Sequence, residues 1–165
     1  NYFKKNFIIN FLIVLTIFFL DRISKLYVIY LNEKNLSPDI FTSKFLNISL
    51  IWNEGIAFGL LSFNQSYLYS LLTVLISIII IIIFFMIMKN DGIKKYSLLM
   101  ILGGALGNLY DRISFQAVPD FIDFHIGNFH WFIFNVSDIF ISVGVFSLIF
   151  LELVDNKKTR ADEKN

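Results

Sequence analysis

The stretch YLYSLLTVLISIIIIIIFFMIM, residues 67–88, sets the class of the fold. It contains no charged residue and is long enough for a helix of about 20 residues, which crosses the hydrocarbon core of a bilayer. The rest of the chain agrees, because its 165 residues are 56% hydrophobic and 18% aromatic, with a mean hydropathy of +0.68. This composition is far more apolar than that of a soluble domain and predicts a membrane protein.

Three further apolar stretches predict membrane-spanning helices, and they cover residues 7–30, 96–113 and 132–154. We therefore expect an all-α membrane protein with four transmembrane helices, forming a single domain over residues 1–165. The connection 31–66 contains KFLNISLIWN, whose partial alternation and β-branched residues predict a short strand or hairpin outside the membrane. The tail 155–165 is expected to be a frayed cytoplasmic end.

Basic residues predict the orientation of the chain. Nine of the fourteen Lys and Arg residues lie before the first span, between the second and third, or after the fourth: Lys4, Lys5, Lys89, Lys94, Lys95, Lys157, Lys158, Arg160 and Lys164. By the positive-inside rule both termini are cytoplasmic, and the connections 31–66 and 114–131 lie outside. No small-x-small cleavage site follows the first span, so we expect it to be retained.

The overall charge and the cysteine count exclude several classes of function. The net charge of +1 comes from 14 basic and 13 acidic residues, which gives no indication of a nucleic-acid partner. The absence of cysteine excludes a disulfide framework, a thiolate zinc site and a cysteine nucleophile. Any chemistry must therefore come from other side chains.

Three carboxylates lie inside the predicted spans at a similar depth. At a rise of 1.5 Å per residue, Asp21, Asp111 and Asp138 lie about 21, 22 and 24 Å from the cytoplasmic boundary. An ionised acid in lipid costs roughly 2.5–3.5 kcal/mol on insertion scales, so each needs a partner, a cavity or a function. The i,i+4 spacing of Asp21 and Lys25 predicts an ion pair. For Asp138, a helix cap and a functional acid are equally open interpretations.

The third span carries a polar face and a glycine pattern. Asn108, Asp111 and Arg112 share one face through i,i+3 and i,i+4 spacing, so this face is expected to look into the helix bundle. Asp111 beside Arg112 is interpreted as a charge-compensated structural pair. Gly103 and Gly107 are spaced as in GxxxG, which predicts close approach of a neighbouring helix.

The second outer connection contains VPDFIDFHIGNFHW, residues 118–131. Asp120, Asp123, His125 and His130 lie within eleven residues, which invites a metal-site interpretation. Their spacing matches neither an HExxH-type helix nor a facial-triad helix, so we expect no metal here. Pro119 has a fixed φ and lacks an N–H, which favours a non-helical turn before Asp120.

Asp120 and Asp138 can be paired as a general acid and a general base. Two carboxyl groups that face each other do not both ionise readily, so one stays protonated while the other stays a base. Such a pair activates water and protonates a carbonyl oxygen, as an aspartic protease requires. Spacing alone does not distinguish Asp120 from Asp111 or Asp123 as the partner of Asp138.

Five motifs occur in order along the chain: DRISK (21–25), NEGIAFGLLS (53–62), GGALGNLYDRI (103–113), VPDFIDF (118–124) and FNVSDIFISVG (134–144). Together they resemble the lipoprotein signal peptidase family, signal peptidase II, over roughly residues 8–150. The resemblance implies an intramembrane aspartyl endopeptidase of the bacterial cytoplasmic membrane. Such enzymes cleave diacylglyceryl-modified prolipoproteins before the lipidated cysteine. The implied partners are prolipoproteins and membrane lipids. We expect a monomer that needs no metal or cofactor, with its active site toward the extracytoplasmic face.

The resemblance also implies roles for individual residues. The family's catalytic aspartates lie in its VxDF and FNxAD motifs, which match Asp120 and Asp138. Its other polar positions match Asn53, Gly55, Asn108, Asp111, Arg112, Asn135, Asp21 and Lys25. Their implied roles are to bind the substrate backbone and to orient the aspartates. Ser137 stands where the family more often has Ala, and we expect its hydroxyl to donate a hydrogen bond to one aspartate.

Two other classes of function compete with a protease. In a small proton- or cation-coupled transporter, Asp21, Asp111 and Asp138 would form a relay across the membrane. A relay needs polar groups in both halves of the bilayer, whereas the polar residues here gather in the outer half. A structural assembly subunit would explain individual pairs but not their shared depth.

Overall fold

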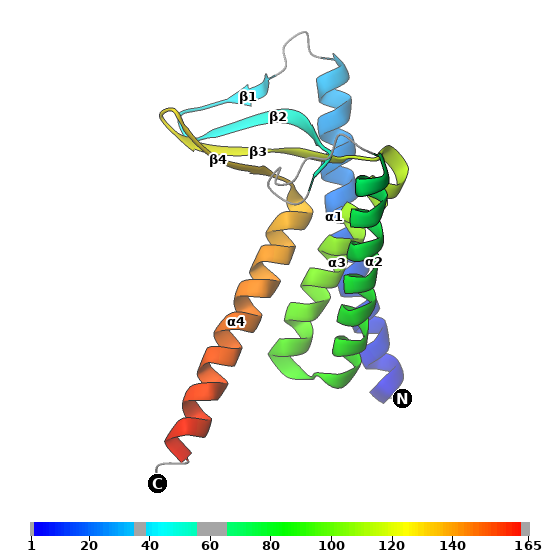
Figure 1. Cartoon of the computed structure of the whole chain (residues 1–165), viewed down its shortest axis with the longest axis vertical. Coiled ribbons are helices and arrows are strands. Elements are labelled where there is room, and N and C mark those ends of the chain that lie inside the picture. Colours follow the sequence, from blue (N-terminus) through cyan, green and yellow to red (C-terminus); the bar gives the residue numbers. More distant parts are fainter. Residues whose placement is uncertain (1, 35–38, 56–65, 163–165) are drawn as a thin grey trace.

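Four long helices carry a four-stranded sheet across one end in the computed structural model, which describes residues 2–34, 39–55 and 66–162 (Figure 1). The helices are α1 (Tyr2–Lys34), α2 (Ser66–Lys89), α3 (Gly92–Phe115) and α4 (Val136–Asp162). The strands are β1 (Asp39–Thr42), β2 (Leu46–Asn53), β3 (Val118–Ile126) and β4 (Phe129–Phe134). The start of α1, the turn between α2 and α3 and the end of α4 all lie at the end opposite the sheet.

Three of the described helices are long and apolar enough to cross a membrane. The spans are Phe7–Lys34 in α1, Tyr69–Lys89 in α2 and Val136–Asp155 in α4. Helix α3 is 24 residues long, as is α2, but it is not one of these three helices. Its mean hydropathy is lower because lysines occupy its first turns and polar residues occupy its last turns. Of the four expected transmembrane helices, three are therefore supported by their length and apolar composition.

The sheet is larger than the sequence predicted. The strand or hairpin expected within residues 31–66 is present as β1 and β2, and they form an antiparallel sheet in the order β1-β2-β3-β4. The second hairpin, β3 and β4, was missed. The fourth span was expected from about residue 132, but its helix begins at Val136. The apolar run FHWFIF before it is strand β4, and such a run extends a hydropathy window whether it forms a helix or a strand.

Pro119 lies in β3, opposite Trp52 of β2, and not in the turn that the sequence favoured. Strand β4 pairs with β3 only from Ile122 onward, so within the described residues Pro119 has no partner strand on that side. A proline is tolerated at such a free edge because its missing N–H breaks no ladder hydrogen bond there.

Two irregularities in the neighbouring strands leave β3 regular. In the β2–β3 ladder two residues of β2, between Ile48 and Ile51, lie opposite one residue of β3. In the β3–β4 ladder the extra residue lies in β4. Side chains along a regular strand alternate between the two faces of the sheet. Asp120 therefore points to one face, whereas Asp123 and His125 point to the other.

Helix α3 is the centre of the bundle and packs against α1, α2 and α4. Its glycines allow this. A Cβ atom on Gly103 would lie 2.9 Å from the Ile17 side chain of α1, and one on Gly104 would lie 2.6 Å from the Ser137 carbonyl oxygen of α4. On Gly107 it would lie 2.5 Å from Ser137 Oγ. The predicted close approach at Gly103 and Gly107 is confirmed.

An apolar core fills the space between α2 and α3. Its fully buried members are Ile80, Ile83, Ile87, Leu98, Leu99, Ile101 and Leu102. These residues come from the part of the two helices nearest their connecting turn, whereas the buried residues Asn108, Asp111 and Arg112 come from the other end of α3. The apolar core and the polar cluster therefore occupy different levels of the same bundle.

We expect Gly104→Ala to destabilise the protein more than Gly103→Ala. The added methyl group at residue 104 meets a backbone oxygen of α4 at 2.6 Å, which only a shift of the helix can relieve, whereas at residue 103 it meets a side chain first. Overpacking of this kind costs about 1–3 kcal/mol. Thermal unfolding of both variants in the same detergent measures the difference, and equal losses would contradict this account of α3–α4 packing.

Candidate active site

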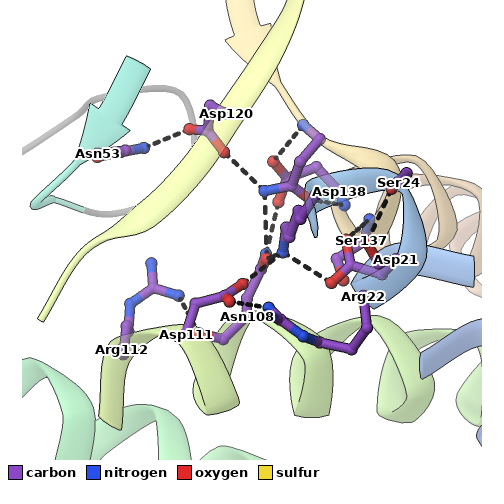
Figure 2. Close-up of polar contacts among 12 residues, drawn as sticks. Asp21, Arg22, Ser24, Asn53, Asn108, Asp111, Arg112, Asp120, Ser137 and Asp138 are labelled. Atoms are coloured by element: carbon purple, nitrogen blue, oxygen red, sulfur yellow. Dashed lines mark hydrogen bonds and ion pairs between the residues drawn. The ribbon is translucent and has the colours of Figure 1, made fainter. Parts of the chain in front are cut away.

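Asp120 lies near the start of β3 and is held by two amide side chains. Asn53 at the end of β2 donates from Nδ2 to Asp120 Oδ2 at 2.8 Å, and Asn135 donates from Nδ2 to Oδ1 at 2.6 Å (Figure 2). The residue is 2% exposed. Because the two amides come from different elements, they fix the plane of the carboxylate between the sheet and the start of α4.

Asp138 closes a reciprocal cap at the start of α4. Its backbone N–H donates to Asn135 Oδ1 at 3.1 Å, and its own Oδ2 accepts from the Asn135 backbone N–H at 3.2 Å. This is the geometry of a capping box, with Asp138 in the third helical position. Its other oxygen, Oδ1, accepts a hydrogen bond from Asn108 Nδ2 at 2.9 Å. The capping role that the sequence left open is therefore confirmed, and it leaves the carboxylate beside the Asn135 side chain.

Asn135 connects the two aspartates. Its side-chain nitrogen binds Asp120, its side-chain oxygen and backbone nitrogen bind Asp138, and it is completely buried. The same nitrogen also donates to Asn108 Oδ1 at 3.2 Å. Asn135 thus holds the Asp120 carboxylate through its side-chain nitrogen and the Asp138 carboxylate through its backbone N–H, at the start of α4.

Lys25 of α1 supplies the positive charge beneath this network. Its ammonium group donates to Asp21 Oδ2 at 2.7 Å, Asn108 Oδ1 at 2.8 Å and Asp111 Oδ2 at 2.7 Å, which uses all three of its protons. Lys25 and both acids are 0% exposed. The predicted Asp21–Lys25 pair is confirmed, and Asp21 Oδ1 also accepts the Ser137 backbone N–H at 2.9 Å.

The expected pair of Asp111 with Arg112 is wrong, because Asp111 is paired with Lys25 and Arg22 of α1. Arg22 also stacks over the ring of Tyr110, with its guanidinium carbon 4.6 Å from the centroid. Sequence reasoning did not place Arg22 among the site residues. Its position in the DRISK motif, next to Asp21, was the available signal.

Arg112 instead connects α3 to the chain after β2. Its Nη2 donates to the Gly55 carbonyl oxygen at 3.1 Å, and its Nη1 donates to the Asn108 carbonyl oxygen at 3.3 Å. The Gly55 backbone N–H donates to Asn53 Oδ1 at 2.8 Å, so Arg112 acts on the residue that holds Asp120. The remainder of the NEGIAFGLLS motif, residues 56–62, lies outside the described residues.

Ser137 does not donate to either aspartate. Its hydroxyl is buried and has no hydrogen-bond partner among the described residues, so the expected hydrogen bond is wrong. The side chain packs instead at the close approach to Gly107. Its small size lets α4 reach α3.

The structure also separates the three acids that spacing left open as partners of Asp138. Asp111 is engaged by two cations of α1. Asp123 points to the opposite face of β3, where it contacts His130. The carboxylates of Asp120 and Asp138 both accept hydrogen bonds from Asn135, so Asp120 is the best partner for a carboxyl pair.

Burial, and next the negative charge of Asp138, raise the pKa of Asp120 to about 7, although hydrogen bonds from Asn53 and Asn135 act in the opposite direction. A carboxyl group with such a pKa holds a proton near neutral pH while its neighbour can remain ionised. A pair of this kind can take a proton from water and give one to a carbonyl oxygen, which is acid–base chemistry for hydrolysis of an amide.

The chain is similar over nearly its whole length to known proteins. The family model described as Signal peptidase (SPase) II matches residues 13–154. A lipoprotein signal peptidase of Pelagibacter ubique (strain HTCC1062) is 55% identical over 161 residues, which cover 98% of this chain and 96% of the relative. One from Anaplasma phagocytophilum (strain HZ) is 40% identical over 148 residues, covering 88% and 92%. A solved bacterial membrane enzyme has a TM-score of 0.74 at 28% identity and covers 90% of each chain.

We expect Lys25→Met to destabilise the protein by about 3–5 kcal/mol, because it leaves two buried carboxylates without their shared cation. Lys44→Met is the matched control, since Lys44 is exposed in the turn between β1 and β2. Its effect should stay within about 0.5 kcal/mol. Thermal unfolding in detergent measures both variants. A Lys25→Met protein as stable as the control would show that the ion cluster contributes little.

We expect the melting temperature of Asp120→Asn, relative to the parent protein, to rise between pH 5 and pH 8. The folded pKa of Asp120 is raised to about 7 from an ordinary value of 3.8, so the folded state binds its proton more tightly than the unfolded state. Stability is therefore lost as the pH rises from about 4 through about 7 and then levels off. The asparagine variant does not lose this stability, because its side chain does not titrate. A melting difference that does not change with pH would contradict the raised pKa.

Proposed function

Because the chain belongs to the signal peptidase II family of lipoprotein signal peptidases, we propose that Asp120 and Asp138 are its catalytic pair. Membership makes the protein an aspartic-type membrane peptidase that removes signal peptides from prolipoproteins. One observation supports the assignment of the pair: two buried carboxylates, from β3 and α4, both accept hydrogen bonds from Asn135, Asp120 from its side-chain nitrogen and Asp138 from its backbone N–H.

The reaction follows from one proton shared by two carboxyl groups. The ionised member takes a proton from water as the water oxygen attacks the scissile carbonyl carbon, and the protonated member gives its proton to the carbonyl oxygen. The product is a neutral gem-diol. As it collapses, the protonated member gives its proton to the leaving nitrogen, the ionised member takes a proton from one diol hydroxyl, and the C–N bond breaks. The products are a carboxylic acid and an amine, and the pair again holds one proton. Each positioned acid or base contributes about 10²–10⁴-fold.

The surrounding polar residues act by holding the pair in place. Asn53 and Asn135 orient Asp120, and Asn108 orients Asp138. The Lys25 ammonium group donates to the Asn108 side-chain oxygen. The Asn108 side-chain nitrogen is thereby oriented to donate to Asp138. Below the pair, the negative charges of Asp21 and Asp111 are compensated by the positive charges of Lys25 and Arg22. Arg112 and Gly55 support Asn53 from the side of the sheet.

The fourth transmembrane helix of this proposal is α3. Its length matches that of α2, it packs between the three apolar helices, and its buried charges face partners inside the bundle. An interior polar face is the arrangement that lets a helix with charged residues cross a membrane. The peptidase would then have four membrane helices with a β-sheet at one surface.

We propose that the catalytic pair lies toward the outer face of the bacterial cytoplasmic membrane. The start of α1, the α2–α3 turn and the end of α4 share one end of the molecule (Figure 1). In the sequence, nine basic residues lie in or next to these segments. The positive-inside rule assigns this end to the cytoplasm, with both termini. The sheet, whose strand β3 contains Asp120, lies at the opposite end.

The substrate would meet the pair from the lipid. The diacylglyceryl chains of a prolipoprotein partition into the bilayer, and the apolar signal helix lies along the bundle with its scissile amide at the level of Asp120 and Asp138. The enzyme would act as a monomer, and its acid–base chemistry requires no metal or cofactor. The transporter alternative finds no support in the family or in the relatives.

We expect Asp120→Asn and Asp138→Asn to lose cleavage of a diacylglyceryl-modified prolipoprotein, each by at least about 10²-fold, because each removes one proton-transfer group. The parent protein should cleave equally well with and without EDTA and should leave the unlipidated substrate intact. Cleavage is followed by the mobility shift of the released product on a gel.

Asp39→Asn is the matched control, since it makes the same change at an exposed residue of β1 in the same sheet. This variant should cleave at the parent rate. The asparagine variants must keep a melting transition, so that loss of cleavage is not loss of fold. Normal cleavage by either folded catalytic variant would contradict the assignment of the pair, even though the chain would still belong to the family.

A further inference from the structure

The face of the sheet opposite Asp120 carries a carboxylate and two imidazoles near the end of the β3–β4 hairpin. Donor atoms of Asp123, His125 and His130 all lie within 4.8 Å of one another. His125 and His130 are direct partners in the β3–β4 ladder, and their rings stack at a centroid distance of 5.0 Å. His130 Nδ1 lies 2.8 Å from Asp123 Oδ2. The cluster is thus built across two strands.

These donor atoms are incompletely used within the described part of the chain. His125 Nδ1 is buried and has no hydrogen-bond partner among the described residues, although buried polar atoms are normally paired. Asp123 is 5% exposed, and its one ion pair with a described residue is with the imidazole of His130. A buried carboxylate beside an unpartnered ring nitrogen is an arrangement that a bound cation would complete.

An outer partner also orients the carboxylate. Asn47 of β2 donates from Nδ2 to Asp123 Oδ2 at 3.4 Å, and Asn47 is the ladder partner of Asp123. Hydrogen bonds of this kind, to the oxygen of a ligating carboxylate, are typical of the surroundings of metal sites. Three strands therefore contribute: β3 supplies two donors, β4 supplies one and β2 holds the carboxylate.

We propose that Asp123, His125 and His130 bind a divalent transition-metal ion of the Zn²⁺ class. Imidazole nitrogen together with carboxylate oxygen is a donor set for Zn²⁺ and its neighbours, whereas Mg²⁺ and Ca²⁺ favour oxygen ligands throughout. Three protein ligands leave a coordination position for water. The ion would join β4 to β3 near the hairpin end and stiffen the sheet that carries Asp120.

The proposal is independent of the catalytic assignment. Asp120 points to the other face of the same regular strand, three residues away from Asp123, and the acid–base reaction of the pair uses no metal. A spacing rule could not find this site, because helical metal motifs are defined along one element. Here the third ligand comes from the facing strand, through the pairing of His125 with His130.

The chain suits a clean test, because it contains two histidines and no cysteine. The full-length protein is purified in detergent, stripped with EDTA, desalted and titrated with Zn²⁺ by calorimetry at pH 7.5. We expect one equivalent to bind, the melting temperature to rise and the side-chain nitrogen signals of both histidines to shift in spectra of ¹⁵N-histidine-labelled protein. His125→Ala, His130→Gln and Asp123→Asn should each weaken binding by at least about 10-fold.

Two control variants locate the ion. Asp39→Asn, an exposed carboxylate change in β1, and Asp120→Asn should bind Zn²⁺ as the parent protein does. Each variant's melting transition shows that it is folded. Failure of the parent protein to bind Zn²⁺, or equal binding by the folded histidine variants, overturns the proposal. Zn²⁺ binding that is lost in Asp120→Asn but kept in the histidine variants also overturns it, by placing the ion at the catalytic pair.

Discussion

A single buried ammonium group holds the polar centre of this protein together. Lys25 of α1 binds two acids and the side-chain oxygen of Asn108, and it is inaccessible to solvent. Without this cation, Asp21 would have no ion-pair partner among the described residues and Asp111 would keep only Arg22, in a low-dielectric interior. With it, α1 is fixed against α3, Asn108 has a defined orientation, and Asp21 is free to receive the first turn of α4. The placement of Asp138 follows from these contacts.

Local spacing predicted much of this arrangement. Hydropathy identified three spans that the structure also supports, and the i,i+4 rule gave the Asp21–Lys25 pair. The common depth of three acids was a sound inference from helix geometry, because Asp21 and Asp111 share Lys25, and Asn108 joins this group to Asp138. The glycine spacing on α3 likewise marked a real close approach.

Contacts between elements were less accessible from the sequence. Asp111 lies beside Arg112 in the chain, yet it binds cations one helix away, because adjacent residues on a helix point in different directions. The β3–β4 hairpin was hidden by its apolar content, which hydropathy alone attributes to a span. Choosing Asp120 over Asp123 required the register of β3, and a shift of one residue would have exchanged their faces. The family resemblance gave Asp120 directly, whereas spacing did not.

The cap at Asn135 has a consequence for the order in which the protein is made. Asp120 is supplied by a strand and Asp138 by the last helix of the chain, and they come together only when the first turn of α4 forms around Asn135. A nascent chain whose first three helices have already left the ribosome still lacks half of the carboxyl pair. Under the proposed assignment, the acid–base chemistry therefore begins only after α4 has been made and has docked, and a nascent chain without α4 cannot cut the membrane proteins inserted beside it.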